Sequence, residues 1–348
     1  MKLMLKIALD VLGGDHVPQA PLGAARQALR ADSELHLTLL GPEDLISRQV
    51  DSWGDVARRV SVVHAPVAIS GSEAQVKAIR SEKQSTIVKG FELLKEQVVD
   101  GFVSAGSTGA LMAGGLLILG RIPGIARPAL PVILPLRGGK KVVLLDAGVN
   151  PDARPAHLVQ YGLMGIAYAR VVLGIDQPRV MLLNIGEEEG KGNELMRATY
   201  GTMREKLGAS FCGNIEARDV FTGKADVVVC DGFTGNVVLK CIEGLATCLM
   251  AILKDEMKAS PVTILGGMLA RPAFTRAKKL LDYSEYGGVP LLGLNGLCVK
   301  CHGSSNEAAI ANGIKVACTS LRKQLLGCLR EAGLAARDEQ SVESQSPV

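Results

Sequence analysis

Aromatic side chains are scarce in this sequence of 348 residues: Phe, Trp and Tyr make up 3% of it, with a single Trp. Proteins that bind single-stranded nucleic acid usually stack bases on aromatic side chains, and nucleic-acid-binding proteins in general follow the phosphate backbone with clustered Lys and Arg. Here the formal net charge is +4 and the basic residues are scattered. The composition therefore gives no support for a nucleic-acid partner.

An export signal is also missing from the first nine residues, where Lys2 and Lys6 interrupt the apolar run and no small-residue cleavage site follows. We therefore expect a cytoplasmic chain whose eight cysteines are reduced and mostly buried. The uncharged stretch between Asp100 and Arg121 is long enough to span a bilayer. Its many Gly and Ser residues instead favour a strand, a loop and a helix, and no other segment looks better suited to span a membrane.

Several catalytic signatures are absent: G-x-G-x-x-G, G-x-S-x-G and H-E-x-x-H. The run from Gly186 to Lys191 differs from a Walker A loop in spacing and ending. Cys298 to His302 matches the haem-attachment pattern C-x-x-C-H, but covalent haem attachment belongs to exported chains. No other Cys or His pair has the spacing of a zinc site, so we expect no metal.

What the sequence does contain is an alternation of short apolar runs with helical patterns, typical of βαβ units around a largely parallel sheet. Strands are predicted at Ile7–Val11, His36–Leu40, Val60–His64, Phe102–Ser104, Val142–Asp146, Val180–Asn184 and Val227–Cys230. Helices are predicted at Pro21–Leu29, Ser85–Gln97, Leu111–Leu119, Ala156–Val172, Glu194–Leu207 and Asn236–Met257. We interpret the apolar stripe of the last helix as core packing. A single α/β domain is expected over residues 1–330, with a disordered tail over residues 331–348, where periodicity is lost.

Polar, glycine-rich loops follow five of these strands. In open α/β sheets the ligand crevice lies beyond the carboxyl ends of the strands, so chemistry is expected here. Glycine and small hydroxyl residues at a helix start present backbone N–H groups that can bind an anion such as phosphate, although plain turns and helix caps remain the structural alternative. The loops are Asp10–His16, Ser104–Ala110, Asp146–Pro151, Asn184–Asn193 and Asp231–Asn236.

Taken in order, these loops resemble the motif series of the phosphate acyltransferase family PlsX. The motifs are ALDVLGGDH from Ala8, VSAGSTGA from Val103, LDAGVN from Leu145, NIGEE from Asn184 and CDGFTGN from Cys230. The likeness extends from Met1 to about Leu329. There are two departures: Ser107 stands where that family is expected to have Asn, and Cys298 to Cys301 stand where its last strand is usually aliphatic.

The resemblance implies an acyltransferase that moves a long-chain acyl group from acyl carrier protein to inorganic phosphate, giving acyl phosphate for phospholipid synthesis without a cofactor. It also implies a homodimer with a three-layer α/β/α fold like those of isopropylmalate dehydrogenase and phosphotransacetylase. Such a protein is cytoplasmic and peripheral at the inner face of the membrane, and a membrane glycerol-3-phosphate acyltransferase would accept its product. Phosphate is already a nucleophile, so the protein mainly has to hold two reactants together and stabilise the oxyanion.

On this basis we expect Lys191 to neutralise phosphate and Asn236 to donate to the developing oxyanion. His16 or His302 would position phosphate or protonate the leaving thiolate. The residues expected to bind phosphate or substrate are Asp10, Gly13, Gly14, Asp15, Ser104, Gly106, Ser107, Thr108, Gly109, Asp146, Asn150, Asp231, Gly232, Thr234, Gly235, His302 and Ser304.

Residues 258–285 are predicted to form a protruding tip, because an unusually apolar run, Pro261–Leu269, is followed by basic residues. Apolar side chains can insert into a bilayer while cations meet anionic headgroups. The same cations could instead receive the acidic carrier protein, and a buried dimer contact is a third alternative. The contact residues would be Leu265, Leu269, Arg271, Arg276, Lys278 and Lys279.

Two other functions stay open. An oxidoreductase of the isopropylmalate dehydrogenase type would share the fold, but it would be favoured by a cluster of metal-binding aspartates that the sequence does not convincingly show. A non-enzymatic adaptor would bind the carrier protein or a membrane without turnover, and would leave the five polar loops without a use.

Overall fold

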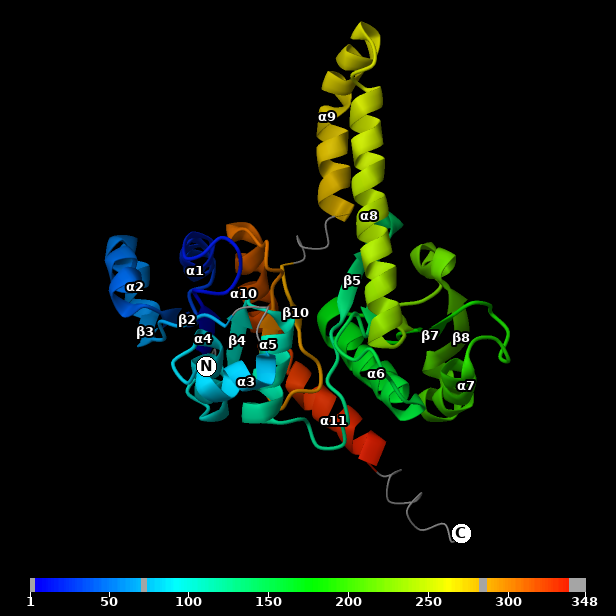
Figure 1. The fold of residues 1–348 in the computed structure, drawn as a ribbon, viewed down its shortest axis with the longest axis horizontal. Helices are drawn as coiled ribbons and strands as arrows, with labels where there is room; N and C mark the ends of the chain where they lie inside the picture. The colour runs from blue at the N-terminus through cyan, green and yellow to red at the C-terminus, as the bar shows by residue number, and fades with distance from the viewer. Residues whose placement is uncertain (1–3, 70–73, 282–286, 338–348) are drawn as a thin grey trace.

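The computed structural model describes residues 4–69, 74–281 and 287–337, which form two sheets, each covered by helices on both faces (Figure 1). The first sheet has the order β10-β11-β4-β1-β2-β3, and all of its pairs are parallel except β10 with β11. Its strands are β1 (Leu5–Asp10), β2 (Leu35–Gly41), β3 (Val60–His64), β4 (Gly101–Ser104), β10 (Val289–Pro290) and β11 (Leu297–Lys300).

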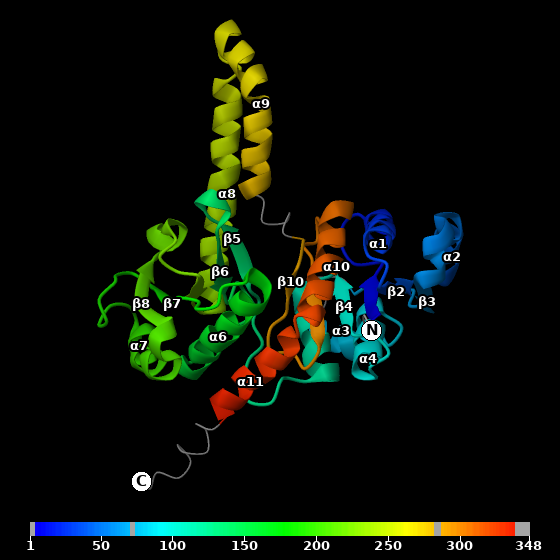
Figure 2. The ribbon, with the colours of Figure 1, turned by 180° about the vertical axis from the view of Figure 1, so that it is seen from behind.

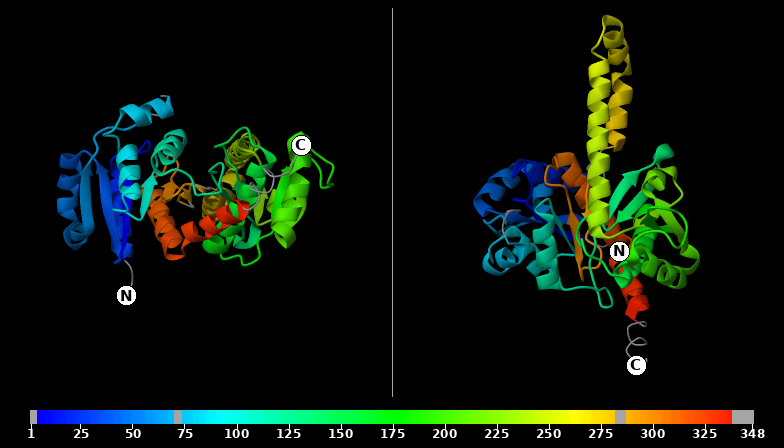
Figure 3. Two further views of the ribbon diagram at one scale, coloured as in Figure 1. Left: turned by 90° about the horizontal axis from the view of Figure 1, so that it is seen from below. Right: turned by 45° about the vertical axis from the view of Figure 1, so that its right-hand side comes forward.

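The second sheet has the order β5-β6-β9-β7-β8 and is parallel except where β5 pairs with β6. Its strands are β5 (Val132–Pro135), β6 (Lys141–Leu145), β7 (Val180–Asn184), β8 (Phe211–Glu216) and β9 (Val227–Val229). The three-layer α/β/α class with mostly parallel strands is therefore confirmed. It is built around two sheets that lie side by side rather than around one (Figure 3).

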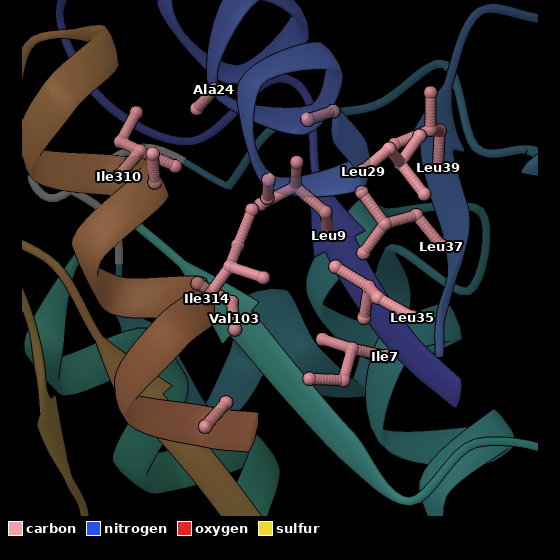
Figure 4. Close-up of a cluster of buried hydrophobic side chains, with 14 of the residues drawn as sticks. Ile7, Leu9, Ala24, Leu29, Leu35, Leu37, Leu39, Val103, Ile310 and Ile314 are labelled. Atoms are coloured by element: carbon pink, nitrogen blue, oxygen red, sulfur yellow. The ribbon is translucent and has the colours of Figure 1, made fainter. Parts of the chain in front are cut away.

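Each face of the first sheet carries its own core. One face packs against α1 (Gln19–Ala31) and α10 (Glu307–Arg322), and Figure 4 shows Ile7, Leu9 and Leu37 meeting Leu29 and Ile314 there. The other face packs against α3 (Gln75–Ser81), α4 (Thr86–Lys95) and α5 (Thr108–Gly114). Because the inner strands are buried on both faces, their sequences are unbroken apolar runs.

The second sheet is covered by α6 (Pro155–Tyr168) and α7 (Glu194–Leu207) on one face and by the start of α8 (Gly232–Glu256) on the other. The chain then returns to the first sheet through β10, β11 and α10. Finally α11 (Leu325–Arg337) packs on α6, so it ties the end of the chain to the second half (Figure 2). The chain beyond residue 330 is thus helical as far as Arg337, contrary to the predicted tail, and residues 338–348 lie outside the described residues.

The apolar stripe of α8 was predicted to pack in the core, and that prediction is wrong for most of the helix. Only its first turns are buried, at Gly232, Gly235 and Leu239. Farther along, Leu245, Leu249 and Ile252 are 68%, 50% and 53% exposed. This part of α8 forms a projecting hairpin with α9 (Pro261–Leu281), visible at the top of Figure 1. The periodicity of the sequence predicts an apolar face on this helix, but the described residues leave it uncovered.

Among the described helices, α8 is also the one that is long and apolar enough to span a bilayer by length and composition. The expectation that no segment would suit this better than the stretch from Asp100 to Arg121 is therefore wrong, since that stretch folds as β4, a loop, α5 and its continuation to Leu119. All eight cysteines are free thiols. Four of them are buried and three are exposed, so the prediction of mostly buried thiols holds for half of them.

Candidate active site

At the carboxyl edge of the first sheet, a buried carboxylate holds two glycine-rich loops together. Asp10, the last residue of β1, accepts hydrogen bonds from the Ser104 hydroxyl (2.7 Å) and from the backbone N–H of Leu12 (3.0 Å). The loops approach so closely that a Cβ on Gly13 would lie 2.5 Å from the Asp10 carboxylate and 2.8 Å from the Gly106 nitrogen. Burial raises the pKa of Asp10. This aspartate is thus a structural acceptor inside the loop cluster.

The second sheet repeats this arrangement at its own carboxyl edge. Asp146 follows β6, is fully buried, and accepts hydrogen bonds from the Asn150 backbone N–H (2.7 Å) and the Leu130 backbone N–H (3.0 Å). Burial also raises its pKa. Gly235, in the first turn of α8, packs so tightly here that an added Cβ would lie 2.0 Å from the Asp146 carbonyl oxygen. Asp231 caps the same helix through a 2.8 Å bond from the Thr234 N–H.

Between these two edges lies a cavity of about 270 Å³ with chemically different walls. The first half supplies polar groups from Thr108, Lys300 and His302. The second half supplies apolar side chains together with the first turns of α8. Its lining there consists of Leu130, Val132, Ile133, Ala147, Gly148, Asn236, Leu239 and Lys240, and residues 287–289 complete the cavity.

His302 has a defined orientation at the polar wall. Its Nδ1 accepts a hydrogen bond from the Ser304 backbone N–H (3.2 Å) and lies 2.8 Å from the Ser304 hydroxyl. Because Nδ1 accepts the backbone N–H of Ser304, the proton of the neutral ring is on Nε2. Burial lowers the pKa of His302, and the nearby charges of Lys300 and Lys240 lower it further. The neutral ring therefore carries its proton on Nε2, at the wall of the cavity.

The predicted site residues lie near these two edges. Three of them line the cavity: Thr108, Asn236 and His302. Lys191 and His16 are exposed on loops of the second and first halves, outside the cavity lining. The other predicted residues lie at the strand ends, in the loops that follow them and in the first turns of the next helices: Gly13, Gly14, Asp15, Ser104, Gly106, Ser107, Gly109 and Ser304 in the first half, and Asn150, Asp231, Gly232, Thr234 and Gly235 in the second. Asp10 and Asp146 are buried behind those loops.

Two cations of the cavity were missed in the sequence, Lys300 and Lys240. Lys240 lies on α8 and pairs with Glu243 at 2.7 Å. Lys300 ends β11, in a segment that reads as an apolar strand. The sequence signal that could have identified Lys300 is its position at the carboxyl end of a buried strand, two residues before His302. Ligand sites of parallel sheets lie at such strand ends.

The C-x-x-C-H segment has no haem-attachment geometry. Cys298 packs among residues on the α4 and α5 side of the sheet, whereas Cys301 packs on the α1 and α10 side. Burial raises the pKa of both thiols, that of Cys301 to about 12. Within the described residues no group of three or more His, Cys, Asp or Glu side chains is arranged to hold a metal ion.

Comparison with known proteins gives a consistent assignment. A family model described as fatty acid synthesis protein matches residues 5–327. A phosphate acyltransferase of Desulforamulus reducens is 47% identical over 330 residues, covering 94% of this chain and 97% of that protein. One of Halothermothrix orenii is 43% identical over 328 residues, covering 94% of this chain and 98% of that protein.

Solved structures support the fold. A phosphotransacetylase from Streptococcus pyogenes superposes with a TM-score of 0.61 at 16% identity, covering 91% of this chain and 93% of that one. EutD phosphotransacetylase from Staphylococcus aureus gives a TM-score of 0.58 at 17% identity, covering 90% and 94% of the two chains. By the extent of the family match and the identity to its curated relatives, this chain belongs to the phosphate acyltransferase family.

Proposed function

We propose that this protein transfers a fatty acyl group from a thioester to inorganic phosphate, releasing a thiol and acyl phosphate. The observation that carries this proposal is the cavity at the carboxyl edges of both sheets, which combines the cations Lys240 and Lys300 with a group of apolar side chains from the second half. Such a cavity suits an anion and the methylene groups of an acyl chain at the same time. Family membership gives the reaction class.

The chemistry needs little beyond placement and charge stabilisation. A phosphate oxygen attacks the thioester carbonyl, and negative charge collects on the carbonyl oxygen. The electrons then return to the carbonyl as the C–S bond breaks and the thiolate leaves, taking up a proton. Asn236, on the first turns of α8, offers an amide donor to the oxyanion. His302 offers Nε2–H to the phosphate or to the departing sulfur.

We also propose the finer assignments that the family resemblance implies. The acyl donor is acyl carrier protein, the protein is a cytoplasmic homodimer, and the projecting hairpin touches the inner face of the membrane, where a glycerol-3-phosphate acyltransferase takes the product. The exposed apolar side chains of α9 support the membrane contact, since Leu265 and Leu269 are 63% and 78% exposed. Arg271 and Arg276 are exposed on the same helix. Lys278 and Lys279 belong to α9, but their side chains lie outside the described part of the structure.

The reaction is tested by measuring release of carrier thiol from palmitoyl-acyl carrier protein with and without inorganic phosphate, while hydroxylamine traps the acyl product. We expect thiol release that depends on phosphate, with recovery of the acyl hydroxamate. Carrier binding without turnover would favour an adaptor, and absence of release with an active carrier substrate would contradict the proposal.

The membrane contact is tested by flotation with phosphatidylglycerol vesicles. The double variant Leu265→Glu, Leu269→Glu should lose most of its binding, because two carboxylates replace the side chains that would insert. Leu334→Glu is the matched control, since Leu334 is 56% exposed on α11, away from the hairpin. Equal flotation of the wild type and the double variant would remove the membrane role from this hairpin.

A further inference from the structure

We propose that the Nζ of Lys300 is the cation that binds the phosphate in this cavity. The proposal rests on the function proposed above. It assigns phosphate, the nucleophile of that reaction, to the side of the cavity that Lys300 lines.

The backbone fixes Lys300 at the point where the two halves meet. Lys300 is the last residue of β11 and lies in register with Ser104, the last residue of β4. Directly after it, the Cys301 N–H donates to the Ser104 carbonyl oxygen at 2.9 Å, which closes the ends of the two strands together. Successive side chains of a strand point to opposite faces, so Lys300 shares the face of Cys298, which packs beside α5. That direction leads to the cavity wall that contains Thr108.

Lys300 differs from the other candidate cations in the partner of its ammonium group. Its Nζ donates to the carbonyl oxygen of Cys301, an uncharged acceptor, and no ion pair among the described residues includes it. Lys240 already has Glu243 as a partner. Lys191 is exposed outside the lining. Within the described cavity, Lys300 is therefore the lysine whose charge no carboxylate balances.

An incompletely neutralised ammonium in a partly buried site favours an anion. Removing a cation from water costs free energy unless an opposite charge or several hydrogen bonds replace the lost solvation. Burial accordingly lowers the pKa of Lys300. Asp15 and Asp10 oppose this lowering, but burial outweighs them. The Asp10 carboxylate is also engaged with Ser104 and Leu12, and its pKa is raised by burial. A bound phosphate would supply the missing charge and stabilise the ammonium form.

The apolar side chains of the cavity would fix where the acyl chain lies once phosphate is bound at Lys300. The second half contributes the apolar side chains Leu130, Val132 and Leu239 to the cavity, with Asn236 and Lys240 beside them on α8. If Lys300 binds phosphate on one side, the carbon chain beside the thioester is left to the apolar side. The carbonyl then lies between them, in the cavity that Asn236 also lines. The two walls thus orient both reactants for attack.

The first experiment compares Lys300→Met with the wild type. We expect the KM for phosphate to rise roughly 10- to 100-fold, the range for losing one hydrogen bond to a charged group, while the KM for palmitoyl-acyl carrier protein changes little. Inorganic phosphate should raise the Tm of the wild type and not that of the variant. Lys323→Met, at an exposed lysine of the same half, is the control and should behave as wild type.

A pH series adds a readout that a purely structural role would not move. The wild-type KM for phosphate should rise at alkaline pH as Lys300 loses its proton, and Lys300→Arg should abolish that rise because guanidinium stays charged. The charged or titratable groups around Lys300 are Cys298 and Cys301 on its own segment, Asp10 and Asp15 of the first loop, His302, and Lys240 of α8. Burial raises the pKa of both thiols, so the cysteines stay neutral through neutral pH.

If Lys300→Met does not fold, protection of the wild-type chain decides the question. Inorganic phosphate should slow acetylation of Lys300 by acetic anhydride, followed by mass spectrometry, while Lys323 reacts at the same rate with and without phosphate. An unchanged phosphate KM and Tm shift in folded Lys300→Met, or acetylation of Lys300 that phosphate does not slow, would overturn the assignment. Those outcomes leave the acyl transfer standing, whereas a wild type that releases no thiol in response to phosphate contradicts the proposed function itself.

Discussion

The residues that organise the candidate site are two buried aspartates, which accept hydrogen bonds from its loops. Asp10 and Asp146 each end or follow a central strand and each accepts hydrogen bonds from backbone N–H groups of neighbouring loops. Because an unpaired buried carboxylate is costly, these bonds fix the loop geometry strongly. The same burial raises the pKa of both residues.

Stability should therefore depend on pH through Asp10. With its pKa raised in the folded state, the folded protein binds more protons than the unfolded chain between the two pKa values. The free energy of unfolding then falls as pH rises through that interval, by about 1.4 kcal/mol per pH unit for one group. We expect Asp10→Asn to weaken this fall, as measured by urea unfolding between pH 4 and 7. Asp152→Asn, at an exposed position, should keep the wild-type slope, and equal slopes in all three proteins would contradict the argument.

At the residue scale, the sequence predicted polar loops at the strand ends but not which of their side chains are buried. An Asp-Gly turn after a strand looks the same whether the carboxylate points into solvent or into the fold, so Asp10 and Asp146 were predicted to bind substrate. Lys300 was missed for the opposite reason, since it is embedded in a run that reads as an apolar strand. Its exposure depends on the neighbouring half of the molecule, which no local pattern encodes.

Among the elements, α8 combines two environments in one helix. Its first turns pack against Asp146 and β6, while its later turns project into the hairpin. The sequence predicted the helix but not this change, because an amphipathic stripe does not say what covers it. Three strands were also missed: β5 ends at a proline on the sheet edge, β8 contains Gly213 at positive φ beside a register shift, and β10 is two residues long.

A pair of glycine substitutions separates the two environments of α8. Gly235→Ala should destabilise the protein by about 1–3 kcal/mol, because its Cβ would lie 2.0 Å from the Asp146 carbonyl oxygen. Gly244→Ala meets nothing within 4 Å and should stabilise the helix by about 0.5–1 kcal/mol. Urea unfolding of both variants checks the prediction. A neutral effect of Gly235→Ala would show that the contact with the Asp146 loop relaxes easily.

At the scale of the whole molecule, the site exists only because the two halves are held against each other. The chain leaves the first sheet after β4, completes the second, and returns through β10 and β11. This return brings Lys300 and His302 opposite α8, and α11 then packs on α6. Fold class could be predicted from the alternation of strands and helices. The division into two sheets could not, because each strand looks alike whichever sheet it joins.

The projecting hairpin has an apolar face on α8 that the described part of the chain does not cover, and we expect a second copy to cover it. Leu245, Leu249 and Ile252 are half or more exposed on that helix, and contiguous exposed apolar surface of this kind marks an association site. Sedimentation equilibrium should give twice the chain mass of 36.6 kDa for the wild type and the single mass for Leu249→Glu. Circular dichroism should be unchanged because the residue is not in the core, and Leu334→Glu should remain dimeric. A wild-type monomer at micromolar concentration, or a dimeric Leu249→Glu, would mean that the α8 face serves another partner.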